Sequence, residues 1–366
     1  MPRPFRADHV GSLLRPPDLL HARDQFARGT LSAEALREQE DAAILKALER
    51  QQEVGLEIFT DGEFRRGSWI TDMADAVDGF VPQSRTIQWR GPGGGAEPST
   101  SSIVGGRLQP RRRLTGAQAA FLKEHAPGAI KITLPAPSNF WVVSWKAGVS
   151  DRAYECRADM LQDVVRIIRQ EIQALIEDGV EYIQMDAPFY GVFIDEQHRA
   201  TLRQAGLDPD AALREVVAAD NAAIEGLSAR DNVTLALHIC RGNSRSRWLY
   251  EGGYNPIAEA LFGTLGVDTF LLEYDTERVG GFEPLRYLPA GKTAVLGLVT
   301  SKEPGLESQD DLRRRIDAAA SVVPLEQLAL SPQCGFASVA LGNLLSEEDQ
   351  WRKLKLVTET AHLVWG

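Results

Sequence analysis

Short apolar runs rich in β-branched residues alternate with longer amphipathic stretches along most of this chain. The short runs are typical of buried strands, and the longer stretches are typical of helices that pack on a sheet. Repetition of this pair predicts a mostly parallel sheet covered by helices. Strands are expected at residues 55–63, 129–137, 181–188, 233–242, 268–275, 293–302 and 327–336. The clearest helices are expected at residues 33–54, 154–178, 210–228 and 309–321.

A further strand near residues 9–12 brings the number to eight, which is the number that closes a (β/α)8 or TIM barrel. Such barrels routinely use 250 or more residues as one domain, so residues 1–366 are expected to form a single barrel domain. The segment 83–113 differs from the rest, because a centre rich in Gly, Pro and Ser separates two extended pieces. It predicts a hairpin or flap inserted after the second strand–helix unit.

The charge of the chain argues against a nucleic-acid partner. The formal net charge is −11, and the longest basic run is Arg111, Arg112 and Arg113. No stretch approaches 18 consecutive apolar residues, and residues 1–16 hold no apolar core of a signal peptide. We therefore expect a cytoplasmic protein that acts on small molecules away from membranes, in an oligomeric state that stays open.

Side chains that can bind a metal gather at the carboxyl ends of the expected strands, which form the mouth of such a barrel. His238 and Cys240 lie two residues apart in one strand and therefore face the same side of it. Glu273 ends the next strand and Cys334 ends the last one. Each residue alone would more often be a packing residue, but two thiolates, an imidazole and a carboxylate together suit Zn²⁺. The third cysteine, Cys156, lies far from any strand end and is interpreted as structural.

Two further carboxylates, Glu63 and Asp186, end other expected strands. Facing one mouth, they could hold a substrate ammonium group, while Ser12 and nearby backbone N–H groups could hold a carboxylate. The pair would then form a clamp for an amino acid. Equally, both carboxylates could cap the following helices or pair with Arg65 or Arg66.

Six motifs occur in one order along nearly the whole chain. They are HVGSLLRP (9–16), DGEFRRGSW (61–69), QMDAP (184–188), HIC (238–240), LLEYD (271–275) and SPQCGF (331–336). Together they resemble the catalytic C-terminal barrel of the cobalamin-independent methionine synthase family. The resemblance implies that His238, Cys240, Glu273 and Cys334 bind zinc.

The resemblance also implies an activity. In methionine synthases the position that matches Ser12 contacts the carboxylate of homocysteine, and those that match Glu63 and Asp186 contact its amino group. Zinc takes the thiol sulfur, which is mostly protonated at neutral pH when free and is deprotonated when it binds a metal. We therefore expect a zinc-dependent S-methyltransferase or S-alkyltransferase that converts a homocysteine-like thiol into methionine or a related thioether.

The chain departs from the family pattern at two places that bear on the methyl donor. Ala187 stands where the family usually has Glu. Lys302 lies at or near the place of a histidine thought to protonate the departing folate nitrogen, and it is either a catalytic group or a solvated surface lysine. The donor therefore stays open among methyltetrahydrofolate, a methylcorrinoid and an epoxide.

Three alternative functions remain beside the methyltransferase. One is an epoxyalkane transferase of the coenzyme M type, which would use the same zinc thiolate. The others are a zinc- or thiol-binding barrel without catalysis, and a metal-free barrel of the uroporphyrinogen decarboxylase group. A metal analysis separates these alternatives, because the decarboxylase-type barrel needs neither cysteine.

Overall fold

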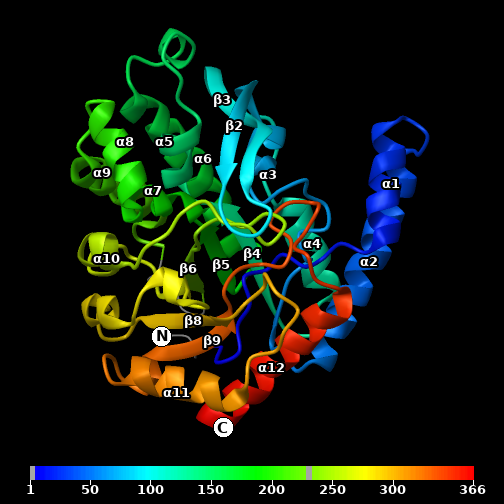
Figure 1. The fold of residues 1–366 in the computed structure, drawn as a ribbon. Helices are drawn as coiled ribbons and strands as arrows, with labels where there is room; N and C mark the ends of the chain where they lie inside the picture. Colours follow the sequence, from blue (N-terminus) through cyan, green and yellow to red (C-terminus); the bar gives the residue numbers. More distant parts are fainter. Residues whose placement is uncertain (1–4, 228–232) are drawn as a thin grey trace.

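A curled parallel sheet forms the centre of the computed structural model, which describes residues 5–227 and 233–366 (Figure 1). Its hydrogen-bonded strands, in spatial order, are β1 (Ile58–Phe59), β4 (Ala129–Pro135), β5 (Tyr182–Asp186), β6 (Thr234–Ile239), β7 (Thr269–Glu273), β8 (Thr293–Val299) and β9 (Leu328–Pro332). All neighbouring strands are parallel, and helices surround the sheet. This is the architecture expected for a (β/α)8 barrel.

Strand β1 is much shorter than the predicted strand at residues 55–63. Gly62 has a φ of 64° and Glu63 a φ of 59°, which is the left-handed region and cannot continue a strand. The chain turns there, and residues 60–63 become the loop that follows β1. The shortening therefore places Glu63 in a loop at the mouth of the barrel.

The segment of residues 5–13 lies between β1 and β9, in the place of the remaining barrel strand. A single backbone bridge joins Ala7 to Leu330 in β9. The regular strand expected at residues 9–12 is not formed, because Gly11 has a φ of 127° and interrupts the extended backbone. The sheet is therefore closed at this point with few backbone hydrogen bonds.

Buried polar side chains supply the contacts that the backbone lacks. The fully buried Lys131 of β4 forms an ion pair with Asp8 and donates a hydrogen bond of 2.7 Å to the backbone oxygen of His9. Tyr182 in β5 donates to Asp8 Oδ2 at 2.8 Å, and Gln184 donates to the backbone of the same N-terminal segment. The segment is thus attached to β4 and β5 through the interior of the barrel.

The inserted hairpin is confirmed and begins earlier than predicted. Its antiparallel strands are β2 (Val77–Trp89) and β3 (Gly95–Pro110), with a register shift near Gly79, whose φ is 102°. Gly79 and Pro82 usually interrupt strands, which is why the sequence pattern missed residues 77–82. The expected range 83–113 thus holds most, but not all, of the hairpin.

The four predicted helices are present with nearly the expected bounds, as α2 (Ala33–Glu53), α6 (Arg157–Glu177), α9 (Pro209–Ile224) and α11 (Gln309–Ala320). Residue 228, the last of the expected helix 210–228, lies outside the described residues. The other α-helices are α1 (Pro17–Ala27), α3 (Thr71–Ala76), α4 (Gly116–His125), α5 (Pro137–Val143), α7 (Gly191–Ile194), α8 (Glu196–Gln204), α10 (Asn255–Phe262) and α12 (Glu347–Trp365). Short 3₁₀ helices occur at Ser150–Arg152, Pro188–Tyr190, Glu277–Val279, Glu283–Tyr287 and Leu325–Gln327.

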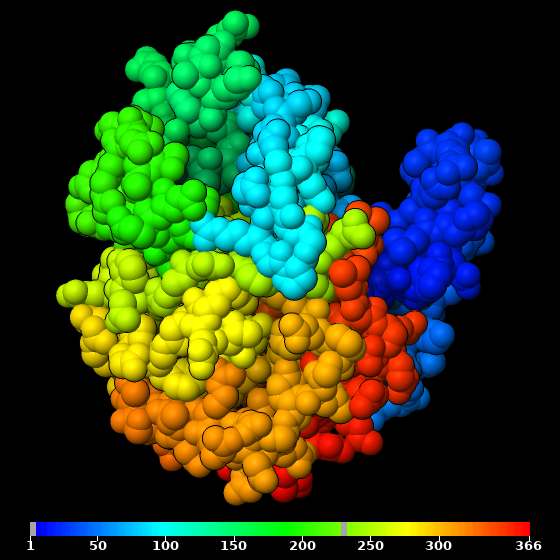
Figure 2. All heavy atoms as spheres, in the orientation of Figure 1, coloured from blue at the N-terminus to red at the C-terminus, as the bar shows by residue number. Residues whose placement is uncertain are grey.

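Most helices lie against the barrel, but α1 and the adjacent part of α2 project from one side of the molecule (Figure 2). Within residues 5–227 and 233–366, no helix has both the length and the apolar character that a bilayer crossing requires.

The ion pair between Asp8 and Lys131 gives a test of how the barrel is closed. Asp8→Asn leaves the Lys131 ammonium group buried without its counter-charge, so we expect the free energy of unfolding to fall by about 3–5 kcal/mol. The double variant Asp8→Asn/Lys131→Met removes both charges and should recover most of that loss. Denaturant unfolding measures the free energy of unfolding of the single and the double variant. Asp24→Asn, in the exposed Asp24–Arg28 pair, is the control and should change that free energy little. Equal losses in the single and double variants would contradict this account.

Candidate metal and substrate site

A cavity of about 410 Å³ opens at the carboxyl ends of the strands, and residues of the β2–β3 hairpin form part of its lining. Its lining includes most of the predicted site residues, namely Ser12, Glu63, Asp186, His238, Cys240 and Cys334. The structure therefore brings three of the four predicted metal ligands and the predicted amino-acid clamp around one cavity. Glu273 and Lys302 lie outside its lining.

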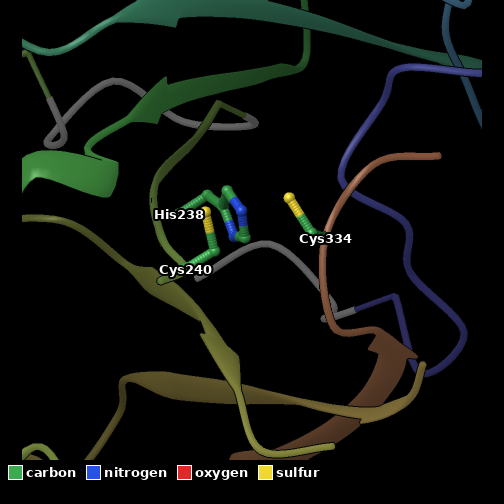
Figure 3. A group of neighbouring side chains, drawn as sticks. All are labelled: His238, Cys240 and Cys334. Carbon is green, nitrogen blue, oxygen red and sulfur yellow. The ribbon is translucent and has the colours of Figure 1, made fainter. Parts of the chain in front are cut away.

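Three of the four predicted metal ligands form a buried cluster. The ligand atoms of His238, Cys240 and Cys334 all lie within 4.8 Å of one another. Figure 3 shows His238 and Cys240 projecting from the end of β6 and Cys334 facing them from the segment after β9. Cys156 is exposed at the N-cap of α6 and takes no part, so it is not a buried packing residue. The cluster could hold a metal ion.

The ring of His238 is oriented as a ligand would be. Its Nδ1 lies 3.2 Å from the backbone oxygen of Leu271 and must carry the proton, since a carbonyl only accepts. Its Nε2 is buried and has no hydrogen-bond partner in the part of the chain that the structure describes. A metal-binding histidine commonly donates through one ring nitrogen and binds through the other. The unpaired Nε2 therefore fits a metal ion.

The two thiols of the cluster have opposite pKa shifts. A hydrogen bond from Cys240, together with the neighbouring His238, holds the pKa of Cys334 well below its usual range, although burial opposes the shift. The pKa of Cys240 is raised well above its usual range, because it donates to the Cys334 sulfur and is buried. The thiolate is the form that binds metals, so Cys334 is prepared for this role.

Glu273 is held apart from the cluster by other partners. Its Oε1 accepts a hydrogen bond of 2.8 Å from Arg278 Nη1, and its Oε2 accepts one of 2.7 Å from the backbone N–H of Arg241. Burial raises its pKa, but Arg278 and the neighbouring Lys302 outweigh that effect, so the net pKa is lowered. The carboxylate is therefore ionised and already paired, and the structure does not bring it into the three-residue cluster.

Lys302 is a buried residue that connects two loops. Its ammonium group donates to Asn243 Oδ1 at 3.0 Å and to the backbone oxygen of Gly242 at 3.3 Å, and the residue is only 6% exposed. It is therefore not a solvated surface lysine. Asn243 in turn donates to the backbone oxygen of Gly335 at 2.7 Å. The pair thus connects the loop that follows Cys240 to the loop that carries Cys334.

Glu63 and Asp186 face the same cavity as buried acids. Glu63 Oε1 accepts from Thr133 at 3.1 Å and lies 3.8 Å from an Arg66 nitrogen, whereas Oε2 is buried without a partner among the described residues. Burial and the nearby Asp186 raise the pKa of Glu63 to about 7. Burial is also the main cause that raises the pKa of Asp186 to about 6. Neither carboxylate caps a helix, but Glu63 forms the ion pair with Arg66 that the sequence left open as an alternative.

Ser12 lies against the loop that carries Cys334. A side chain at Gly335 would begin only 1.9 Å from Ser12 Oγ, so only glycine allows this approach. The backbone oxygen of Ser12 also accepts a hydrogen bond of 2.9 Å from Phe336 N. The residue is therefore held against the loop that carries Cys334.

Two arginines support the site but were not predicted. The buried Arg15 donates to the backbone oxygens of Glu63 at 2.8 Å, Arg66 at 2.9 Å and Ala337 at 3.0 Å. Its place in the motif HVGSLLRP was the available signal, because an arginine inside an otherwise apolar motif suggests a buried structural role. Arg278 had no such signal, since its pairing with Glu273 depends on how the loop after β7 turns back.

The tip of the hairpin is attached to the loop after Cys240. Arg90 and Trp248 exchange backbone hydrogen bonds of 2.8 and 3.2 Å, and the Arg247 guanidinium binds Glu97 through contacts of 2.5 and 2.8 Å. Arg90 also pairs with Asp195 at 2.6 Å. Figure 2 shows the hairpin in cyan against the yellow-green segment of that loop. The hairpin is therefore a wall of the cavity with a fixed tip.

Comparisons with known proteins agree with this geometry. The family model described as "Cobalamin-independent synthase, Catalytic domain" matches residues 5–347. A Bacillus subtilis protein named "Uncharacterized protein YxjH" is 40% identical over 368 residues, with 99% of this chain and 95% of the relative covered. A methionine synthase of Saccharolobus solfataricus is 24% identical over 356 residues, with 97% and 93% covered.

Two solved structures are similar over their whole length. The putative vitamin-B12 independent methionine synthase from Listeria monocytogenes shares 32% identity at a TM-score of 0.76, with 100% of this chain and 99% of that chain covered. The B12-independent methionine synthase from Shewanella sp. W3-18-1, solved in complex with selenomethionine, shares 20% identity at a TM-score of 0.73, with 99% and 98% covered. These likenesses confirm the predicted barrel fold and the resemblance found in the sequence.

The raised pKa of Glu63 predicts a pH dependence of stability. The folded state binds this proton near pH 7, whereas the unfolded chain binds it near the ordinary value of 4.5. The unfolding free energy of the wild type should therefore rise, relative to Glu63→Gln, as the pH falls from about 7 towards 4.5. Denaturant unfolding of both proteins across this range measures the difference. A difference that does not change with pH would contradict the raised pKa.

Proposed function

Because the chain belongs to the cobalamin-independent synthase family, which is a family of methyltransferases, we propose that it is a zinc-dependent S-methyltransferase acting on an amino-acid thiol. Its substrate is a homocysteine-like thiol and its product is methionine or a related thioether. The observation that carries the proposal is one cavity that holds a His/Cys/Cys cluster beside two buried carboxylates. The first group suits a metal-bound sulfur and the second suits an ammonium group.

We assign zinc to His238, Cys240 and Cys334, whose donor set is typical of Zn²⁺ sites. The unpaired Nε2 of His238 and the lowered pKa of Cys334 support the assignment. When bound, zinc would keep a substrate thiol in the thiolate form, which is the nucleophile in alkyl transfer. Three protein ligands leave one position of a tetrahedral set for that thiol or for Glu273, which Arg278 holds nearby.

The clamp orients the rest of the amino acid. The unpaired Glu63 Oε2 and the carboxylate of Asp186 accept the ammonium group, and Ser12 donates to the carboxylate. Two buried acids suit an amino-acid thiol better than a sulfonate thiol, whose negative charge they would repel. This argues against the coenzyme M-type alternative. Ala187, which replaces the family's usual glutamate, leaves these two acids as the clamp.

Lys302 supports the site rather than transferring a proton to the leaving group. It does not line the cavity, and its ammonium group is directed at Gly242 and Asn243. From that position its positive charge contributes to the lowered pKa of Cys334 and of Glu273. We therefore assign it an electrostatic and positioning role behind the cluster.

The metal assignment is tested by Cys334→Ser, with Cys156→Ser as the matched control because Cys156 is exposed and remote from the cluster. We expect about one zinc ion per wild-type chain by elemental analysis, as a single four-coordinate site requires. Losing a ligand should weaken zinc binding at least about 100-fold, since even loss of a ligand's hydrogen-bond partner costs 10- to 100-fold. Methionine formation from homocysteine, with methyltetrahydrofolate or methylcobalamin as donor, should fall with the zinc content.

Cys156→Ser should match the wild type in zinc content and in methionine formation. Wild-type protein without zinc after metal-replete preparation would refute the metal assignment and favour the decarboxylase-type barrel. Zinc without transfer to any thiol would instead favour a binding protein.

The clamp is tested by comparing homocysteine with 4-mercaptobutyrate, which lacks the amino group. Asp186→Asn removes one ionised partner of the ammonium group, so we expect the KM for homocysteine to rise roughly 10- to 100-fold. The same substitution should leave the KM for 4-mercaptobutyrate nearly unchanged. If both thiols are affected equally, Asp186 acts on the metal-ligand cluster or on folding and not on the amino group.

A further inference from the structure

The hairpin contributes one wall of the cavity through residues of both strands. The cavity-lining residues on this wall include Arg85, Ile87 and Trp89 of β2 and Glu97, Ser99 and Ser101 of β3. Arg85 lies directly across from Ser99, and Ile87 lies across from Glu97. Period-two geometry places these side chains on one face of the hairpin. The wall therefore combines apolar groups, hydroxyls and two charges.

Only one charge on this wall lacks a partner. Glu97 accepts both arms of the Arg247 guanidinium and is thereby neutralised. Arg85 is the only arginine or lysine among the lining residues of the described chain. Its Nε is buried without a hydrogen-bond partner, and its guanidinium forms no ion pair within residues 5–227 and 233–366. A half-buried cation without a counter-ion is unfavourable unless a ligand supplies one.

The surroundings of Arg85 are suited to an acidic group. A guanidinium presents its donors as a planar fork that matches carboxylate and phosphate oxygens. Ser99 across the ladder adds a hydroxyl that can donate to the same oxygens. Tyr250 is the group nearby that interacts electrostatically with Arg85, and burial raises the pKa of Tyr250 well above its usual range. Tyr250 is therefore neutral at physiological pH and cannot serve as the counter-ion.

We propose that Arg85 binds an acidic group, a carboxylate or a phosphate, on the methyl donor. This inference rests on the proposed function, because the amino-acid thiol would occupy the clamp formed by Ser12, Glu63 and Asp186. Those residues belong to the barrel mouth, whereas Arg85 belongs to the hairpin that covers it. The donor therefore lies between the cluster and the hairpin, with its acidic part against β2 and β3.

The test compares donors with and without an acidic group by calorimetric titration, without turnover. Methyltetrahydrofolate carries carboxylates, and a methylated tetrahydropterin without the aminobenzoylglutamate tail carries none. Methylcobalamin carries a phosphate, and methylcobinamide lacks it. Arg85→Gln should weaken binding of the acid-bearing donor roughly 10- to 100-fold and leave its acid-free counterpart unchanged, which is the range for losing a charged hydrogen bond. A response within the folate and pterin pair identifies the acidic group as a carboxylate, and a response within the cobalamin and cobinamide pair identifies it as a phosphate.

Two further variants separate charge from packing. Arg85→Lys keeps the charge and should retain part of the affinity for the acid-bearing donor, even if Arg85→Gln folds poorly. Arg111→Gln removes the same charge from the exposed pair with Asp78 and should have no effect. The proposal would be overturned by a folded Arg85→Gln protein whose affinities for the acid-bearing and the acid-free donor keep the wild-type ratio. An effect of the substitution on homocysteine binding alone would overturn it too. These ratios are measured independently of zinc content and methionine formation, so they are distinguishable from a failure of the proposed function.

Discussion

The close approach of Ser12 to Gly335 is the contact on which the site depends. It brings the N-terminal segment against the loop after β9, at the mouth of a barrel whose remaining closure uses few backbone hydrogen bonds. Arg15 reinforces the approach by binding backbone oxygens of the loops on both sides. Without this closure, Cys334 would not face the end of β6, and Ser12 would not face the same cavity as Glu63. The cavity is therefore a product of barrel closure.

Three residues that line this cavity each have a buried polar atom without a hydrogen-bond partner. His238 Nε2, Glu63 Oε2 and Arg85 Nε are each buried without a hydrogen bond in the described part of the chain. Leaving a buried polar atom unpaired costs roughly 1–3 kcal/mol, and more when the group is charged. The three atoms differ in character, since one is a neutral nitrogen lone pair, one is an acid and one is a cation. In the proposed function they would face a metal ion, an ammonium group and an acidic group.

The sequence predicted those parts of the site that follow from the barrel alone. His238 and Cys240 share a strand face, and Cys334 follows a strand that ends at the same mouth, so strand order was sufficient to bring them together.

The position of Glu273 was less predictable, because the loop after β7 returns Arg278 to its carboxylate. The sequence pattern did not single out Arg85, for a similar reason. Its proposed role depends on how the hairpin folds over the mouth, and a hairpin's direction is not encoded in its alternation pattern. The strand expected at residues 9–12 does not form, because Gly11 has a φ of 127° that interrupts the extended backbone.

The hairpin and the cluster are also joined by a continuous series of contacts. The backbone of Arg90 at the hairpin tip pairs with Trp248, and the Arg278 guanidinium lies 4.5 Å from the centre of the Trp248 ring. Arg278 in turn binds Glu273, the predicted metal ligand that lies outside the three-residue cluster. A hairpin that moved away would take its hydrogen bonds from Trp248 and loosen the ring on which Arg278 packs. The wall that carries Arg85 and the side chain that holds Glu273 therefore share one support, which links the hairpin side of the cavity to the side that holds His238, Cys240 and Cys334.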